Sequence, residues 1–215
     1  MEEIVRKVSE HIKIKLLNDF SGHDWYHVER VYNNSVLIAS HISDCDMLLV
    51  ELSALLHDIA DHKFGYSELE RNQEISTLLL DLNVDELITR KVINIVNKVS
   101  YSKNKNCTTE EIETKVIQDA DRLDAIGAIG IARTFAFGGN MQVPIITQNE
   151  SDTTSIKHFY DKLLLLKDTM HTDIGKKLAL ERHLFMIEFL KQFQKETQHA
   201  HFKSTVVNLS PAYEH

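Results

Sequence analysis

The sequence predicts an all-α protein, and three observations support that fold class. The 215 residues include only seven glycines and two prolines, so few residues interrupt regular secondary structure. Apolar residues recur at the spacing of a helix face rather than at every second position. With 43% hydrophobic residues, the chain is long enough to bury a core. We therefore expect a helical bundle.

The first two helices are predicted from apolar spacing and one capping residue. A first amphipathic helix covers about residues 4–16 and is interrupted by Ser21 and Gly22. Aspartate is a preferred N-cap, so Asp24 is expected to begin a second helix that continues through Ile38.

The third helix is the most apolar segment of the chain. We expect it to open at Ser43–Asp44, and its residues 47–56 are apolar on nearly all sides, which is typical of a central helix. Further helical patterns follow at residues 68–82, 85–98, 109–125 and 128–137.

Breaker residues then separate the C-terminal part. Residues 138–155 contain two glycines and a proline and predict a loop, either an active-site lid or a surface loop. Two more helices are expected, one through Phe159, Leu163 and Leu166, the other over about residues 175–196.

The domain prediction follows from these elements. We expect one domain over residues 1–215, with a core of about 20–137, C-terminal helices over about 155–196 and a tail over 197–215. The tail lacks a clear period, so it is either a packed arm or frayed. The sequence leaves a monomer and a homodimer open.

The overall composition excludes several classes of partner. The formal net charge of −8 is a poor match to a nucleic-acid backbone, so no nucleic-acid partner is expected. Apolar runs such as residues 163–166 are far shorter than the roughly 20 residues that cross a bilayer, so no membrane partner is expected either. Cys45 and Cys107 lie far apart in a chain without a secretory signal. These features predict a soluble, cytoplasmic protein with reduced thiols.

A histidine and two acids follow the most apolar helix. His57, Asp58 and Asp61 lie at or just beyond its end. Burying an unpaired carboxylate is costly, so such residues either coordinate a cation or accept strong hydrogen bonds. The alternative is that they mark the helix end.

A second group of polar residues forms a stripe on the second helix. His23, His27 and Arg30 are spaced so that they share one face. An arginine one turn from a histidine suits a metal-bound phosphate, because a guanidinium matches two phosphate oxygens. The alternative is an ordinary surface or core histidine.

A third group contains three acids on an otherwise buried helix. Asp121 and Asp124 share a face, whereas Asp119 points elsewhere. Taken alone, this segment favours N-capping or ion pairing with Arg122. Together, however, the three groups supply imidazole and carboxylate donors, which are the ligand types of divalent Zn, Mn, Fe, Co and Ni sites.

In this order the three segments resemble the HD-domain metal-dependent phosphohydrolase superfamily, whose motif is H…HD…D. The matching residues are His27, the doublet His57-Asp58, and Asp121 in the string Ala-Asp-Arg-Leu. Residues 22–31, 119–133 and 158–196 further resemble a bacterial subgroup of small stand-alone HD hydrolases.

This resemblance implies a helical core around one divalent ion, with His27, His57, Asp58 and Asp121 as its ligands. Manganese is the favoured ion, and Mg, Fe, Ni, Co or Zn are alternatives. Asp121 ranks above Asp119 because the superfamily's last ligand precedes Arg-Leu. Two-metal members carry further histidines between the doublet and the last aspartate, where this chain has only His62.

The resemblance also implies catalytic roles. Several one-metal members carry a glutamate where this chain has Asp61, which is therefore the candidate general acid/base beside the catalytic metal ligand Asp58. Expected contacts to an anionic substrate come mainly from cations near the motif or on the C-terminal helices, and from one histidine: Arg30, Lys63, Arg122, Arg133, Lys162, Lys167 and His23.

The predicted function is hydrolysis of a phosphate ester or anhydride of a small molecule, with a nucleotide favoured. Either a nucleoside triphosphate pyrophosphohydrolase or a nucleotide phosphatase fits these residues. The alternatives are an HD-fold di-iron oxygenase, which requires the missing histidines, and a non-catalytic sensor that binds a metal-nucleotide.

Overall fold

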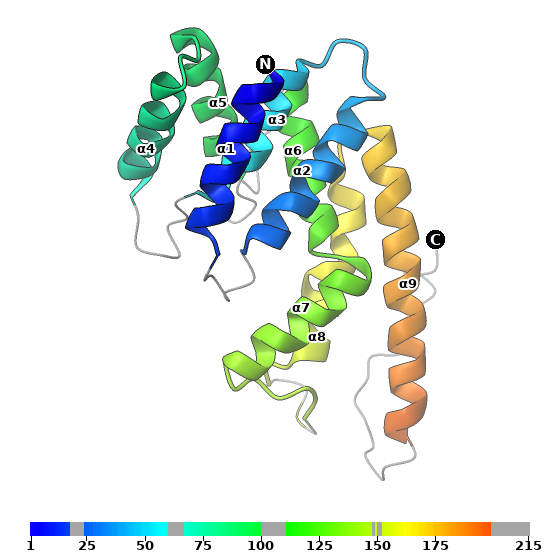
Figure 1. Cartoon of the computed structure of the whole chain (residues 1–215). Helices are drawn as coiled ribbons and strands as arrows, with labels where there is room; N and C mark the ends of the chain where they lie inside the picture. The colour runs from blue at the N-terminus through cyan, green and yellow to red at the C-terminus, as the bar shows by residue number, and fades with distance from the viewer. Residues whose placement is uncertain (18–23, 60–66, 100–110, 148, 150–151, 199–215) are drawn as a thin grey trace. The chain divides into compact units, whose positions relative to one another are not determined.

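The computed structural model describes residues 1–17, 24–59, 67–99, 111–147, 149 and 152–198 (Figure 1). Within these residues all regular secondary structure is helical, which confirms the all-α prediction. The chain divides into two compact units, Met1–Asp121 and Arg122–His215. The expectation of a single domain stays a prediction.

The first unit contains five complete helices in its described part, together with most of a sixth. Their bounds are α1 Glu2–Lys15, α2 Trp25–Ala39, α3 Met47–Leu56, α4 Glu68–Asp81, α5 Glu86–Val99 and α6 Ile112–Asp124. Predicted and observed bounds agree closely for α1, α2, α4 and α5. The predicted start of α6 at Thr109 lies outside the described residues.

Helix α3 is the centre of this unit, as its apolar composition predicted. It packs against α1, α2 and α5, and Val50, Leu52 and Leu56 have no exposed surface. The predicted opening of the helix at Ser43–Asp44 was wrong. Asp46 is the N-cap, and its carboxylate accepts hydrogen bonds from the backbone N–H groups of the second and third helical residues.

Capping and polar contacts fix the helices around α3. Ser67 and Glu70 form a reciprocal capping box that begins α4, which packs against α5. On α6, the side chain of Gln118 donates to the carbonyl oxygen of Lys98 on α5 over 2.8 Å. The Gln118 hydrogen bond therefore ties α6 to α5, on which α4 packs.

The second unit contains the last residues of α6 and the C-terminal helices. Their bounds are α7 Gly127–Asn140, α8 Ser155–Asp161, the 3-10 helix η2 Leu163–Thr169 and α9 Asp173–Gln198. Helix α7 packs against α8 and α9, and η2 packs against the same two helices. Phe135, Phe159 and Phe189 bring their rings together from α7, α8 and α9, with centroids 5.9–6.0 Å apart.

Two predictions for this unit were wrong in detail. Helix α7 continues through Gly138 and Gly139, for which the sequence predicts a loop. A Cβ added to Gly138 would lie 2.3 Å from the hydroxyl of Ser155, so this glycine permits close packing rather than breaking the helix. The helix expected through Phe159 and Leu166 is instead two pieces, α8 and η2, which meet at Lys162.

Two of the remaining expectations concern the membrane and the tail. No described helix combines the length and the apolar character needed to cross a membrane. Of the predicted tail, residues 197–198 end α9 and residues 199–215 lie outside the described part of the chain.

The central position of α3 generates a stability prediction. Leu52→Ala removes a fully buried side chain and should lower the free energy of unfolding by about 2–5 kcal/mol. Leu69→Ala is the matched control, because Leu69 is 75% exposed, and should change it by less than about 0.5 kcal/mol. Urea denaturation followed by circular dichroism measures both. Equal losses of unfolding free energy in the two variants would contradict the central position of α3.

Candidate metal centre

Helix α2 presents His27 from its first turn. The carboxylate of Asp24 caps the helix by accepting the backbone N–H of His27 over 2.9 Å, as the sequence predicted. Trp25 and Val28, which flank His27 in the sequence, are buried, and His27 itself has no exposed surface. A fully buried imidazole needs polar partners, and the next two segments provide them.

His57 follows the last turn of α3 and is held in one orientation. Its ring nitrogen Nδ1 lies 2.8 Å from the carbonyl oxygen of Ala54. A carbonyl oxygen can only accept, so Nδ1 carries a proton and donates. In the neutral ring Nε2 then has its lone pair available, which is the arrangement found at metal-binding histidines.

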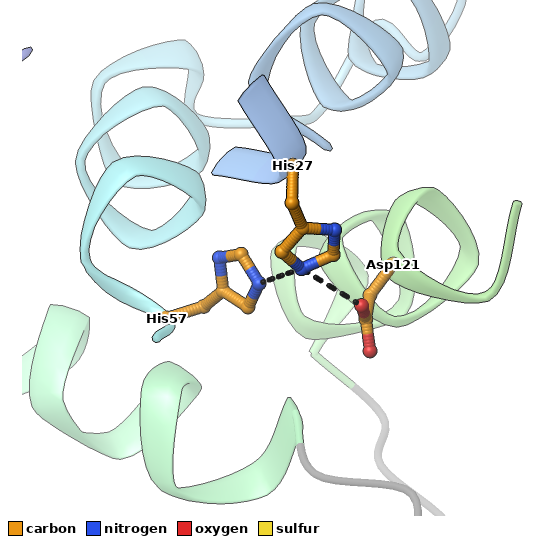
Figure 2. A group of neighbouring side chains, drawn as sticks. All are labelled: His27, His57 and Asp121. Carbon is orange, nitrogen blue, oxygen red and sulfur yellow. Dashed lines mark hydrogen bonds and ion pairs between the residues drawn. The ribbon is translucent and has the colours of Figure 1, made fainter. Parts of the chain in front are cut away.

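Three further side chains, those of His27, Asp58 and Asp121, gather near this nitrogen. Nε2 of His57 lies 3.3 Å from Nε2 of His27, which in turn lies 3.6 Å from Oδ1 of Asp121 (Figure 2). Oδ2 of Asp58 lies 3.2 Å from the His27 nitrogen and 3.5 Å from the His57 nitrogen. Helices α2, α3 and α6 therefore place donors around a single point.

These separations fit one divalent ion. Two donors that each lie about 2.1 Å from the same ion are about 3.0–3.4 Å apart in octahedral or tetrahedral geometry. Two of the four distances above, 3.2 and 3.3 Å, fall in this range, and the other two, 3.5 and 3.6 Å, lie just above it. One ligand atom each from His27, His57 and Asp121 also falls within a common 4.8 Å. Two imidazoles and two carboxylates suit Mn, Fe, Co, Ni or Zn.

The geometry also distinguishes the two aspartates that the sequence left open. Asp121 points its carboxylate at His27 and keeps 31% of its side chain exposed. Asp119 is fully buried and is not part of the group formed by His27, His57 and Asp121. The choice of Asp121 over Asp119 as the last ligand stays a prediction.

A partly buried hydrogen bond joins α2 to α3. The hydroxyl of Tyr32 on α2 donates to Oε1 of Glu51 on α3 over 2.8 Å. Burial, followed by the neighbouring Glu51 carboxylate, raises the pKa of Tyr32 to about 12. The phenol therefore stays protonated at neutral pH and keeps donating, which fixes α2 against α3.

Of the predicted substrate contacts in the first unit, only Arg30 is described. It is partly buried and lies one turn after His27 on the same face of α2. His23, Lys63 and the candidate acid/base Asp61 lie outside the described residues, so their roles stay predictions.

In the second unit, two predicted contacts are engaged with acids. Arg133 pairs with Oδ2 of the buried Asp124 over 2.7 Å, and Lys167 lies 3.3 Å from Oδ1 of Asp168. Lys162 is exposed where α8 meets η2. The buried ion pair gives Arg133 a structural role, and the predicted substrate contacts of these residues remain predictions.

Arg122 has a partner that the sequence did not reveal. Its Nη1 donates to the carbonyl oxygen of Thr169 and lies 3.0 Å from Nε2 of His171. In the sequence, His171 has no partner at helical spacing that would indicate a role. A contact across 49 positions leaves no local signal in the sequence.

Comparison with known proteins identifies the class. Residues 24–126 match the HD domain, a range that includes His27, His57, Asp58 and Asp121. The uncharacterized protein YpgQ of Bacillus subtilis is 39% identical over 183 residues, which cover 84% of this chain and 87% of YpgQ.

Solved structures agree in fold. An HD-superfamily hydrolase from Bacillus thuringiensis superimposes with a TM-score of 0.77 at 38% identity, covering 92% of this chain and 98% of that one. The structure of Bacillus subtilis YpgQ in complex with ADP gives a TM-score of 0.74 at 34% identity, covering 89% and 97%. The chain therefore belongs to the HD-domain superfamily, among small proteins like YpgQ.

The cluster generates a metal-binding prediction. Asp121→Asn removes one anionic donor and should weaken Mn²⁺ binding at least about tenfold, whereas Asp119→Asn should change the affinity by less than about threefold. Isothermal titration calorimetry measures both, and thermal melts verify that each variant is folded. If only Asp119→Asn lost Mn²⁺ affinity, Asp119 rather than Asp121 would be the last metal ligand.

Proposed function

We propose that this protein is a single-metal phosphohydrolase that cleaves a phosphate ester or phosphoanhydride of a small molecule, with a nucleotide as the favoured substrate. Release of pyrophosphate from a nucleoside triphosphate and removal of a terminal phosphate both suit the site. Manganese is the proposed ion, and the cytoplasm is the proposed location.

One observation carries the proposal: His27, His57, Asp58 and Asp121 converge at the spacing of ligands to one ion. Membership of the HD-domain superfamily supports hydrolysis, and the ADP complex of YpgQ supports a nucleotide. Four protein donors leave positions open for water and substrate at a metal that accepts six ligands, which favours catalysis over a purely structural site.

The residues of the cluster have distinct tasks. The hydrogen bond to Ala54 keeps the His57 ring turned so that Nε2 faces the other donors. Burial of His27 and His57 keeps bulk water from competing for the same donors. A divalent ion bound by these residues supplies Lewis-acid stabilisation of a phosphoryl oxygen and lowers the pKa of a bound water.

Charged residues outside the cluster complete the proposed site. Asp61 is the proposed general acid/base, because several one-metal members of the superfamily carry a glutamate at this position, where it handles the proton of the attacking water or the leaving group. Arg30 and Arg122 are the proposed phosphate contacts. Since the chain is acidic overall, such cations are needed to offset the charge of an anionic substrate.

The first prediction concerns activity. With Mn²⁺ bound, the protein should release phosphate or pyrophosphate from one or more nucleotides, and chelation should abolish this. His57→Ala should lower kcat/KM by at least about a thousandfold because it removes a ligand. His41→Ala replaces an exposed histidine and should leave the rate unchanged. Mn²⁺-loaded protein that releases neither product across a nucleotide panel would refute the proposal.

The second prediction concerns acid/base chemistry. Asp61→Asn should lower kcat by about 10²–10⁴-fold while Mn²⁺ and ADP still bind, because only proton transfer is lost. Asp44→Asn replaces an exposed aspartate and serves as the control. Steady-state kinetics measures the loss of kcat, and calorimetry measures whether Mn²⁺ and ADP still bind. Full activity in Asp61→Asn would argue against this role, and binding without turnover in the wild type would favour a sensor.

A further inference from the structure

Helix α4 carries an arginine on the face that otherwise holds its buried apolar residues. Arg71, Ile75 and Leu79 are spaced four residues apart and are the buried residues of this helix. Only 7% of the surface of Arg71 remains exposed, whereas Ile75 and Leu79 have no exposed surface. An arginine is almost never buried to this extent unless its charge is paired, so this position requires an explanation.

The side chain of Arg71 is held by a neutral amide. Its Nη2 donates to Oδ1 of Asn97, in the last turn of α5, over 2.5 Å, while its buried Nε has no hydrogen-bond partner. Within the described part of the chain no carboxylate is paired with this guanidinium, and Glu74, the acid one turn further along α4, pairs instead with Lys15 of α1. An amide oxygen orients a guanidinium but does not neutralise its charge.

Two other arginines of the same unit have the opposite setting. Arg6 and Arg90 are exposed, and each pairs with a glutamate four residues away on its own helix, over 2.6 and 3.4 Å. Around the buried Arg71 the low dielectric makes an unneutralised charge costly and strengthens its attraction to an anion. The setting of Arg71 therefore suits a small anion that neutralises the charge and accepts the remaining hydrogen bonds.

Two side-chain hydrogen bonds connect Arg71 to the helix that carries Asp121. Asn97 precedes Lys98, whose carbonyl oxygen accepts the side-chain amide of Gln118 on α6 over 2.8 Å. Gln118 is three residues before Asp121, which is less than one helical turn. Helix α5 also packs against α3, whose end carries the motif doublet, and all these residues belong to the first unit. Arg71 therefore contacts the end of α5 that lies near Asp121.

We propose that Arg71 binds a phosphate group of the substrate beside the proposed metal centre, with Asn97 holding the guanidinium in place. This inference rests on the proposed function, which supplies a phosphate-bearing substrate, and it adds a contact that the sequence did not indicate. A guanidinium has five N–H donors, so the bond to Asn97 leaves donors for two phosphate oxygens. The anion reaches Arg71 through the part of its surface that stays exposed.

The test replaces Arg71 in the full-length, Mn²⁺-loaded protein. Arg71→Met removes the charge and should weaken binding of inorganic pyrophosphate at least about tenfold and raise KM for the nucleotide by a similar factor. Arg71→Lys keeps a cation without the planar fork and should weaken pyrophosphate binding by about threefold. Arg90→Gln removes an exposed arginine, so both values should stay within about twofold of the wild type. Isothermal titration calorimetry and steady-state kinetics measure these values.

Thermal melting distinguishes a binding role of Arg71 from a structural one. Because the buried charge is costly while no anion is bound, Arg71→Met should melt at or above the wild-type temperature without pyrophosphate. Saturating pyrophosphate should then raise the melting temperature of the wild type more than that of Arg71→Met. If Arg71→Met does not fold, Arg71→Lys decides, and wild-type affinity for pyrophosphate in that variant overturns the inference.

The remaining outcomes separate this inference from the proposed function. The inference is overturned if Arg71→Met binds pyrophosphate as tightly as the wild type, if its only change is a lower melting temperature, or if the wild type binds no pyrophosphate. A wild type that binds pyrophosphate through Arg71 but hydrolyses no nucleotide refutes the proposed function alone, because the loss of affinity in Arg71→Met is still measured.

Discussion

The structure depends on one electrostatic constraint: the Nε2 atom of His27 lies 3.2–3.6 Å from His57 and from the carboxylates of Asp58 and Asp121, and Asp58 lies 3.5 Å from His57. Electron-rich atoms at this spacing repel unless a proton or cation lies between them, and burial strengthens the repulsion. A single proton can bridge only one pair. A divalent ion bound by all four residues, as we propose, would satisfy these donors together.

The rest of the first unit positions these donors. Helix α3 supplies His57 and Asp58 from its end, and its apolar surface lets α1, α2 and α5 pack around it. The contact from Tyr32 to Glu51 fixes α2, and the capping carboxylate of Asp24 fixes the turn that carries His27. The helix that packs at the centre of the first unit is thus followed directly by His57 and Asp58. The stability of this unit and the geometry of the proposed metal site are therefore linked.

Sequence patterns predicted those features that depend on interactions between residues close together in the chain, such as the bounds of a capped helix. Helical spacing and Asp24 predicted α2 nearly to the residue. The order of His27, the doublet and Asp121 predicted a ligand set through the resemblance to the HD superfamily, and that set stays a prediction. Contacts between residues far apart in the chain could not be predicted from these patterns. Gly138 looked like a breaker because its close approach to Ser155 is invisible in sequence, and Lys162 gave no sign of the break between α8 and η2. His171 was missed because its partner is distant in the chain.

The central claim is that one divalent ion is bound by His27, His57, Asp58 and Asp121. Crystals grown with Mn²⁺ and measured at the manganese absorption edge test it most directly. The account predicts one anomalous peak per chain, about 2.0–2.3 Å from Nε2 of both histidines and from one oxygen of each aspartate. Two peaks, no peak, or a peak bound by Asp119 in place of Asp121 would contradict it.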